Sequence, residues 1–404
     1  MNNTIKLAVA SALLAAASSA SAAGGIVAGD WTLDVGGVVN AYYTNTKVKG
    51  NSHGTNFAGA SSTGTSTVSN ITTGLLPNYL SVSGKTRQND LDVAFTISIN
   101  PGASTTASGN QAALQENRQA FLTFGDASWG SMKLGKDIGI YASDAILNDM
   151  TLLGVGSAAG ALAGNTTTLG RIGTGFMYAD WKAQVAYTSP NFNGFQFTAG
   201  VTQAFDAATA GQNVQIGANA GNDAVAPRGG KEPAFEAKAS YSFAADAVTG
   251  KVWASGISQN MEQYNQTSSA WDLGANVNAA GFGLTGYYGE GRGLGTAVQF
   301  NGAYDKNGGE KRKSDDWYVQ ATYALPGVGT KLGASYGESQ LKGAGATDSL
   351  LGVNSLKDSM WVAGVYHPIT KHLNLVAEYS DTETKLGTSK GTAKTMSAGA
   401  ILFF

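Results

Sequence analysis

The stretch Leu91–Asn100, LDVAFTISIN, decides the fold class. Large apolar side chains occupy every second position, namely Leu91, Val93, Phe95, Ile97 and Ile99. Small or polar side chains occupy the positions between them, namely Asp92, Ala94, Thr96, Ser98 and Asn100. A period of two is the pattern of a half-buried β-strand, because successive side chains of a strand point to opposite faces. This segment therefore predicts a strand with one apolar face and one polar face.

The same period recurs along the whole chain and predicts an all-β protein. Most of the segments have the 9–11 residues with which a tilted β-strand crosses a bilayer. We expect sixteen strands, near 31–45, 78–86, 90–100, 118–125, 129–136, 178–189, 194–203, 235–244, 250–258, 270–279, 281–289, 315–325, 329–338, 358–367, 372–380 and 395–404.

The links between these strands alternate between long and short. The long ones are rich in Gly, Ser, Thr and Asn and cover 46–77, 101–117, 137–177, 204–234, 259–269, 290–314, 339–357 and 381–394. Short turns fall at 86–90, 125–130, 279–281, 325–329 and 367–372. A soluble β-sandwich has no reason to sort its links by length. An antiparallel transmembrane barrel does, with short periplasmic turns and long external loops.

The composition excludes several other classes of protein. The 404 residues contain 55 Gly, 7 Pro and no Cys, and the net charge is −2. A nearly neutral chain lacks the basic stripe of a nucleic-acid-binding protein, and a chain without cysteine has neither disulfides nor thiolate metal ligands. The three histidines, His53, His367 and His372, fall in predicted loops or turns. We therefore predict no enzymatic activity, no metal site and no cofactor.

The N-terminus has the order of features of an export signal. Lys6 precedes the apolar stretch Leu7–Ala17, and the small residues Ala20-Ser21-Ala22 follow it. The apolar stretch is too short to span a bilayer, and small residues mark a cleavage site. We predict a signal peptide over 1–22 and a single barrel domain over 23–404; the alternative is a buried N-terminal helix.

Several segments resemble the general porins of Gram-negative bacteria. The last residues, Met396–Phe404, alternate and end in Phe, as the terminal strand of outer-membrane proteins does. Further matches are Arg118–Gly125, Trp129–Lys136, Val185–Phe195 and Tyr366–Tyr379. The resemblance implies a trimeric channel of sixteen strands in the cell outer membrane, with its third loop folded into the lumen. It also implies contact with lipid and lipopolysaccharide, and recognition of Phe404 by the barrel-assembly machinery.

In that family, basic residues on the wall face carboxylates on the third loop at the pore constriction. Lys136 keeps one basic position, but Tyr79 stands where an arginine is expected and Asp180 where another basic residue is expected, with Lys182 two positions on. Asp149 matches the acidic position of the loop. We expect Asp149 and Lys136 to face each other. The candidate constriction residues are Lys136, Asp149, Lys182, Lys133, Asp144 and Tyr79.

Strand parity predicts which polar side chains line the lumen. They are Asp92, Lys133, Lys182, Gln184, Glu236, Lys238, Asp272, Asn276, Gln320, Lys331, Asn374 and Glu378. Sixteen strands enclose an interior too wide for side chains to fill. The sequence therefore predicts a water-filled channel for passive diffusion of small hydrophilic solutes and ions. Two alternatives stay open: a substrate-specific channel with a solute-binding constriction, and a barrel that serves as an enzyme or an adhesin.

Overall fold

A computed structural model of the chain describes residues 25–50, 64–103, 115–157, 167–204, 232–305, 309–346, 348, 351 and 354–404. The predicted signal peptide lies outside these residues. In the described part of the chain, no helix has both the length and the apolar character needed to cross a bilayer.

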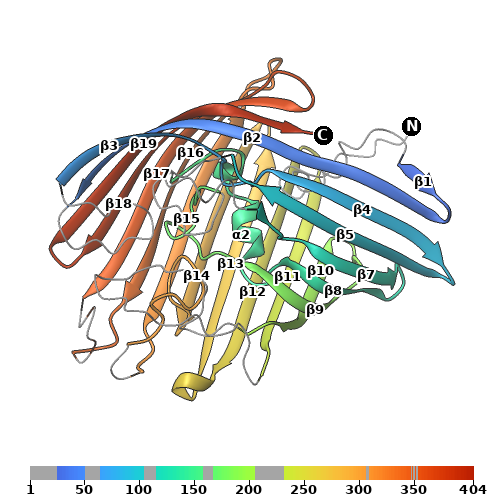
Figure 1. Cartoon of the computed structure of the whole chain (residues 1–404), viewed down its shortest axis with the longest axis horizontal. Helices are drawn as coiled ribbons and strands as arrows, with labels where there is room; N and C mark the ends of the chain where they lie inside the picture. Colours follow the sequence, from blue (N-terminus) through green and yellow to red (C-terminus); the bar gives the residue numbers. More distant parts are fainter. Residues whose placement is uncertain are drawn as a thin grey trace.

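Sixteen antiparallel strands form the wall (Figure 1). They are β2 (Trp31–Gly50), β4 (Tyr79–Gln88), β5 (Leu91–Pro101), β7 (Ala120–Asp126), β8 (Gly130–Ile138), β9 (Trp181–Thr188), β10 (Phe195–Thr202), β11 (Ala234–Ala245), β12 (Val248–Met261), β13 (Gln266–Ala279), β14 (Phe282–Arg292), β15 (Lys313–Ala324), β16 (Lys331–Lys342), β17 (Ser355–Pro368), β18 (Leu373–Leu386) and β19 (Ser389–Phe403). Each corresponds to one of the predicted strands.

Three short strands pair with strands of the wall but are not counted among its sixteen strands. β3 (Gly64–Thr72) pairs with the second half of β2, and β4 pairs with the first half. β5 likewise pairs with both β7 and β6 (Gln115–Glu116). β1 (Ile26–Ala28) pairs with the start of β2.

The last strand closes the barrel onto the first long one. β19 pairs with β2 from Phe403↔Val38 to Gly391↔Gly50. The terminal residue continues this contact, because Phe404 N donates to Gly37 O (3.1 Å) and Gly37 N to Phe404 O (2.9 Å). Closure leaves the wall without an unpaired edge, which a bilayer requires of any sheet that spans it. The predicted sixteen-stranded barrel is confirmed.

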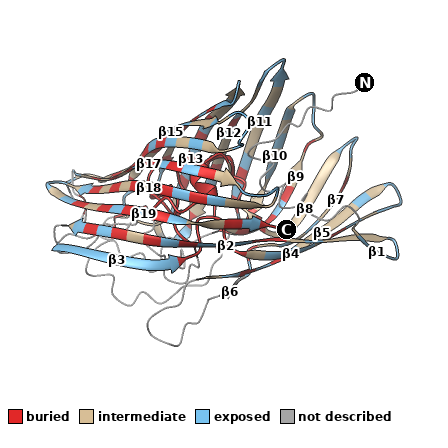
Figure 2. Ribbon diagram, turned by 90° about the horizontal axis from the view of Figure 1, so that it is seen from above, coloured by how far each residue is buried: buried red, intermediate tan, exposed pale blue. Residues whose placement is uncertain are grey.

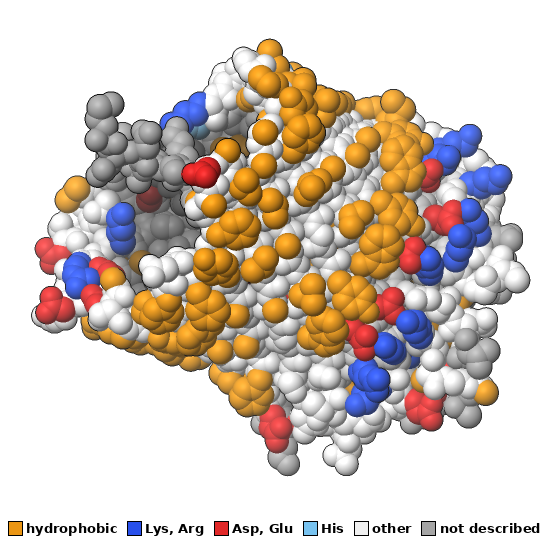
Figure 3. All heavy atoms as spheres, turned by 180° about the vertical axis from the view of Figure 1, so that it is seen from behind, with side chains coloured by type: hydrophobic (Ala, Val, Ile, Leu, Met, Phe, Trp, Pro, Cys, Tyr) orange, Lys and Arg blue, Asp and Glu red, His pale blue; other side chains and the backbone are white. Residues whose placement is uncertain are grey.

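The two faces of the wall differ as the period of two predicts. Buried and exposed residues alternate along β12–β19, as Figure 2 shows for β17, β18 and β19. The exposed set is apolar, for example Val319, Leu332, Val365 and Leu375, and it forms a broad hydrophobic surface in Figure 3. Outward apolar side chains meet lipid, so burial from water in this molecule marks the inner face.

The strands of the wall are shorter on one side of the barrel than on the other. β4, β5 and β7–β10 have 7–11 residues, and we call them the low wall. β11–β19 with β2 form the high wall, in which most strands have 12–15 residues and β2 has 20.

Two predicted long loops are wrong for this reason. Within 259–269, β12 and β13 continue to Met261 and Gln266. Within 381–394, β18 and β19 continue to a turn of only two residues, Gly387 and Thr388. These extensions expose polar side chains on their outer face, so their sequence lacks the apolar alternation of a lipid-facing strand.

The connection between β8 and β9, which we call loop 3, folds into the lumen as predicted. It spans 139–180, of which 139–157 and 167–180 are described. It contains the short helix α2 (Ser143–Leu147), seen inside the barrel in Figure 1, and a 3-10 turn, η1 (Met150–Leu153).

Candidate functional site

Glu236 on β11 holds the start of loop 3 against the wall. Its Oε2 accepts hydrogen bonds from the backbone N–H groups of Ile140 (2.8 Å) and Tyr141 (2.9 Å). Its Oε1 pairs with Lys182 Nζ at 2.5 Å, and both side chains are fully buried. A carboxylate that accepts two successive backbone N–H groups satisfies donors that would otherwise lie unpaired in the interior.

Glu378 on β18 holds the middle of loop 3 in the same way. Its Oε2 accepts from Val155 N and Gly156 N, each at 2.8 Å, and its Oε1 accepts from Tyr366 Oη (2.6 Å). Gly154 packs so close to this carboxylate that a Cβ there would collide with it. The glycine therefore permits the approach of loop 3 to Glu378.

Between these two anchors, neutral side chains of the high wall bind the loop backbone. Tyr318 Oη donates to Ala145 O (2.9 Å), and Tyr42 Oη donates to Leu153 O (2.7 Å). Gln320 bonds twice, because its amide accepts from Met150 N (2.7 Å) and donates to Asn148 O (3.0 Å). Loop 3 is thus bound from β11 round to β18 and β2.

Asp144 in α2 is the third charged anchor. It pairs with Lys238 of β11 (3.3 Å) and with Lys251 of β12. Burial opposes ionisation of this carboxyl group, but the two ammonium groups outweigh that effect and hold its pKa below the ordinary value. The pair of lysines therefore stabilises an ionised Asp144.

Asp149 is buried beneath the loop and does not face Lys136. Its carboxylate accepts from Thr151 N (3.2 Å) at the start of η1, and it lies 3.8 Å from Nε of the fully buried Arg171. Burial raises the pKa of Asp149 and lowers that of Arg171. Arg171 also donates to Met360 O (3.0 Å) and to the Ser335 hydroxyl. The Asp149–Arg171 pair therefore joins the two described parts of loop 3, 139–157 and 167–180, to β16 and β17.

Apolar packing closes the space between loop 3 and the high wall. Loop residues such as Leu152, Val155 and Phe176 are buried in one hydrophobic cluster with inward-facing wall residues such as Val362 and Ile401. Phe176 lies against Tyr318, with ring centroids 5.9 Å apart. The low-wall residues Tyr79 and Ile138 pack against the same cluster, so loop 3 is held on both sides by apolar contacts.

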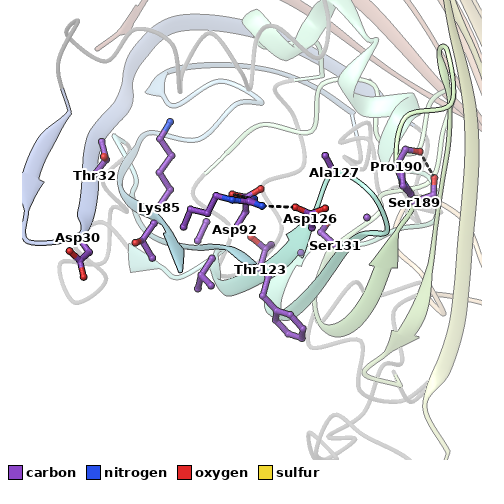
Figure 4. A pocket seen from close by; sticks show the side chains of 17 residues that line it. Asp30, Thr32, Lys85, Asp92, Thr123, Asp126, Ala127, Ser131, Ser189 and Pro190 are labelled. Atoms are coloured by element: carbon purple, nitrogen blue, oxygen red, sulfur yellow. Dashed lines mark hydrogen bonds and ion pairs between the residues drawn. The ribbon is translucent and has the colours of Figure 1, made fainter. Parts of the chain in front are cut away.

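The wider of two cavities on the low wall has a volume of ≈ 650 Å³, and we call it the vestibule. Lys85, Arg87 and Asp92 line it at the ends of β4 and β5 that meet in a short turn. Figure 4 shows Lys85, Asp92 and Asp126 around this space. Arg87 pairs with Asp92 and with Asp126, both at 2.8 Å. The vestibule is a charged chamber at the periplasmic end of the lumen.

The narrower cavity has a volume of ≈ 60 Å³ and lies between loop 3 and the low wall; we call it the slot. Leu147 and Leu152 line it from the loop, Tyr79 from β4 and Trp181 from β9. Tyr79 on β4 lies six residues from Lys85 of the vestibule. At about 3.3 Å per residue, the two cavities follow one another along the same strands over about 20 Å.

The structure separates the six candidate constriction residues. Tyr79 lines the slot. Lys133 and Lys136 lie on β8; Lys133 pairs with Asp137 and lies over the Phe121 ring, and Lys136 Nζ donates to Asn117 O (2.7 Å). The other three, Asp144, Asp149 and Lys182, hold loop 3 in place.

Strand parity identified the wall residues Glu236, Gln320 and Glu378 as inward-facing, but it gave no sign that they bind loop 3. Arg171 and Arg118 were missed. Arg171 lies in an irregular segment, where no periodicity assigns a direction to a side chain. Arg118 lines the slot with its guanidinium 5.7 Å from the Trp181 ring centroid, just before the regular part of β7. The residue pattern before β7 offers no signal for that placement.

Comparison with known protein families matches residues 8–387 to the Gram-negative porin family. The chain is a Gram-negative porin. A closed antiparallel barrel of this family is a channel of the outer membrane, so the predicted location and the predicted diffusion channel are confirmed. The proteins of this family are channels rather than enzymes. No curated protein sequence matches this porin.

Solved structures share the fold of this porin over nearly its whole length. The outer-membrane channel DcaP of Acinetobacter baumannii has a TM-score of 0.63 at 14% identity, covering 94% of this chain and all of that one. An anion-selective porin from Comamonas acidovorans has a TM-score of 0.56 at 13% identity, covering 93% and 100%. OmpF of Salmonella typhi has a TM-score of 0.55 at 15% identity, covering 94% and 99%.

Proposed function

We propose that small hydrophilic solutes and ions diffuse passively through this porin along the low wall, from the slot to the vestibule. The observation that carries the proposal is the order of the two cavities on β4, β5, β7 and β8.

Within this passage, Tyr79 and Lys133 are the candidate constriction residues closest to the path. Tyr79 lines the slot, and Lys133 keeps 31% of its side chain exposed on β8. The other four candidates act on the constriction only through the strand or loop that they hold in place; they are Lys136, Asp144, Asp149 and Lys182. We propose no catalytic role for any of them, because the proteins of this family are channels.

The second candidate function is a substrate-specific channel. The observation that favours it is the mainly apolar lining of the slot, with Arg118 as its charged residue, where the family resemblance implies facing charges.

The partners follow from the location in the outer membrane and from the family resemblance. A homotrimer is the assembly that the resemblance implies. Toward the loop end of the high wall, Lys313, Lys342 and Lys357 pair with carboxylates of neighbouring strands. Figure 3 shows a strip of charged residues beside the hydrophobic surface. Lysines at that level suit the phosphates of lipopolysaccharide. Phe404, which ends the closing strand, is the residue for the assembly machinery to recognise.

The test is single-channel conductance in a planar bilayer with a salt gradient across it. We expect steady openings in steps of three, and the reversal potential gives the preferred ion sign. Folded protein that inserts but does not conduct would contradict the open-passage proposal.

A further inference from the structure

A second long connection of the barrel is packed inside the protein. It joins β14 to β15 over 293–312, of which 293–305 and 309–312 are described, and we call it loop 6. Its side chains Leu294 and Phe300 are at most 1% exposed. An external loop surrounded by water would leave such apolar side chains exposed, so loop 6 must cover them against other parts of the molecule.

Loop 6 packs on the wall and on loop 3 at the same time. Leu294 and Phe300 share a hydrophobic cluster with Ile257 of β12 and with Tyr141 and Met177 of loop 3. The wall residues of this cluster lie toward the loop ends of β11, β12 and β13. Loop 6 therefore occupies the lumen at that end of the barrel, over the ends of loop 3.

Gln299 is the residue that ties loop 6 to loop 3. Its side chain is fully buried, and its Nε2 donates to Tyr178 O (3.1 Å) and to Ala179 O (3.2 Å). Its Oε1 accepts from Lys182 Nζ (2.6 Å), and Lys182 also pairs with Glu236, which holds the beginning of loop 3. One side chain of loop 6 is thus bonded to the end of loop 3 and, through Lys182, connected to its beginning.

The backbone of loop 6 has a shape that its sequence does not favour. Ala297 and Phe300 have φ angles of 66° and 67°, in the left-handed region that residues with a Cβ rarely adopt. Such conformations persist only where the surrounding structure imposes them. Ala297 lies at one of these contacts, because its carbonyl oxygen accepts from Tyr178 N (2.7 Å). Contacts with loop 3 therefore help to hold loop 6 in its inward position.

A buried ion pair holds the other end of loop 6. Arg312 donates from Nε (2.8 Å) and from a terminal nitrogen (2.7 Å) to the two carboxylate oxygens of Asp348, in the connection between β16 and β17. Arg312 also donates to Gly302 O within loop 6 (2.9 Å). A two-pronged pair of this kind fixes geometry as well as distance. Loop 6 is thus fixed at its base, and Gln299 holds its inner part.

We propose that loop 6 forms a second, outer constriction of the channel and that Gln299 locks it against loop 3. Loop 6 narrows the lumen before solutes from outside reach loop 3, and release of the lock lets its inner part move away and increases the current. This inference rests on the proposed channel and adds a positioning residue to it. It does not depend on the route that solutes take past loop 3.

The position of loop 6 can be tested with single thiols, because the chain has no cysteine. Val298→Cys replaces a side chain of loop 6 that is 1% exposed, and Thr267→Cys places the reference thiol at an exposed position of β13. We expect a charged methanethiosulfonate reagent to modify the folded Val298→Cys porin much more slowly than the Thr267→Cys porin. Equal rates would show that loop 6 lies open to water and would overturn the constriction.

The lock is tested by adding a second substitution to Val298→Cys. Gln299→Met keeps a side chain of similar length but removes its hydrogen bonds to loop 3 and to Lys182. We expect labelling to become about tenfold faster, which corresponds to about 1.4 kcal/mol less stabilisation of the closed loop and lies in the range for lost hydrogen bonds of a buried group.

Gln340→Met is the matched control, because Gln340 lies on the outer face of β16, on the same side as the exposed Tyr336. It should leave the labelling rate of the Val298→Cys porin unchanged. A Gln299→Met rate no higher than that of this control would show that Gln299 is not the lock.

Conductance in planar bilayers shows whether loop 6 limits the current. Gln299→Met channels should make transient steps to a higher conductance, and wild-type and Gln340→Met channels should not. Faster labelling without such steps would mean that loop 6 moves but does not limit the current, which overturns the outer constriction. Wild-type protein that conducts no current would instead contradict the proposed channel, and the labelling rates would still decide whether Gln299 is the lock.

Discussion

At the scale of the residue, we predict how strongly the anchor Glu378 holds loop 3. Glu378→Ala leaves the N–H groups of Val155 and Gly156 unpaired, at a cost of about 1–3 kcal/mol for each group. Glu378→Gln keeps an acceptor oxygen and should have a milder effect. We expect strong open-channel noise in the alanine variant and weak noise in the glutamine variant, measured in planar bilayers. Equal noise in wild-type and alanine variants would mean that Glu378 does not hold the loop.

The pH dependence of loop 3 also belongs to this scale. The pKa of Asp144 is lowered in the folded protein, so its pairs with Lys238 and Lys251 stabilise the loop fully above the unfolded value of about 3.8. That stabilisation is lost as the pH falls through the lower folded value. The part of the noise that depends on Asp144 should thus be constant above about pH 3.8 and grow as the pH falls through the lower folded value. Asp144→Asn, already noisy at pH 7, shows what other carboxyl groups contribute; a wild-type channel no quieter than Asp144→Asn at pH 5 would contradict the role of Asp144.

At the scale of the element, the outer faces of the high wall carry three successive layers. On β14 and β15, going along the strand away from the membrane centre, an aromatic residue is followed by a carboxylate and then by a basic residue; on β15 these are Trp317, Asp315 and Lys313. On β18, two carboxylates follow the aromatic residue before the lysine. The aromatic residues mark the membrane interface. The carboxylates and lysines pair across strands, as in Lys342–Asp315 (2.5 Å) and Lys357–Glu338 (2.6 Å).

These layers give a test of lipopolysaccharide contact. Replacing Lys313, Lys342 and Lys357 together by Gln should lower the amount of lipopolysaccharide that copurifies with the porin. Each basic residue near an anionic surface contributes about 1 kcal/mol. Lys371→Gln, in a turn at the opposite end of the barrel, is the control. If the triple variant retains as much lipopolysaccharide as the control, these lysines are not its contact.

The strands themselves were predictable because lipid imposes a period of two on one face. Leu91–Asn100, for example, coincides with β5 almost residue for residue. The prediction failed where that constraint ends, as at 381–394, where Asp381, Glu383 and Lys385 face outward above the membrane. Loop 3 follows no period at all. Its partners, among them Arg171, depend on contacts far apart in the sequence, so the site was predictable only for its wall residues.

At the scale of the whole molecule, the unequal wall suggests where copies meet. The outer face of the low wall exposes aliphatic Leu80, Ile97, Leu122 and Val185, and its exposed aromatic residues, Trp129, Phe195 and Phe197, lie near the short turns at the other end of the strands. The chain of aromatic contacts from Trp271 to Tyr379 runs along the high wall. We expect the low wall to be the contact between protomers of the proposed trimer, since at the loop end of its strands it shows no counterpart of these aromatic pairs among the described residues, and a surface covered by protein needs none.

A matched pair of substitutions tests that arrangement. Val185→Lys on the low wall and Val319→Lys on the high wall place the same charge on an exposed valine of the outer face. We expect the first to lower the temperature at which the trimer dissociates on an unheated gel much more than the second does. The same loss for both variants would indicate a general effect of a charge in lipid.

The pairing of β19 with β2 also determines when the barrel can close after the chain is synthesised. The closing ladder joins Val38, in the first long strand of the wall, to Phe403, in the last strand, which is synthesised much later. No earlier fragment can complete the cylinder, so the whole polypeptide must reach the membrane before it can seal. A chain that is cut short during synthesis or export keeps two open margins with unpaired backbone groups, and it remains a substrate for periplasmic proteases.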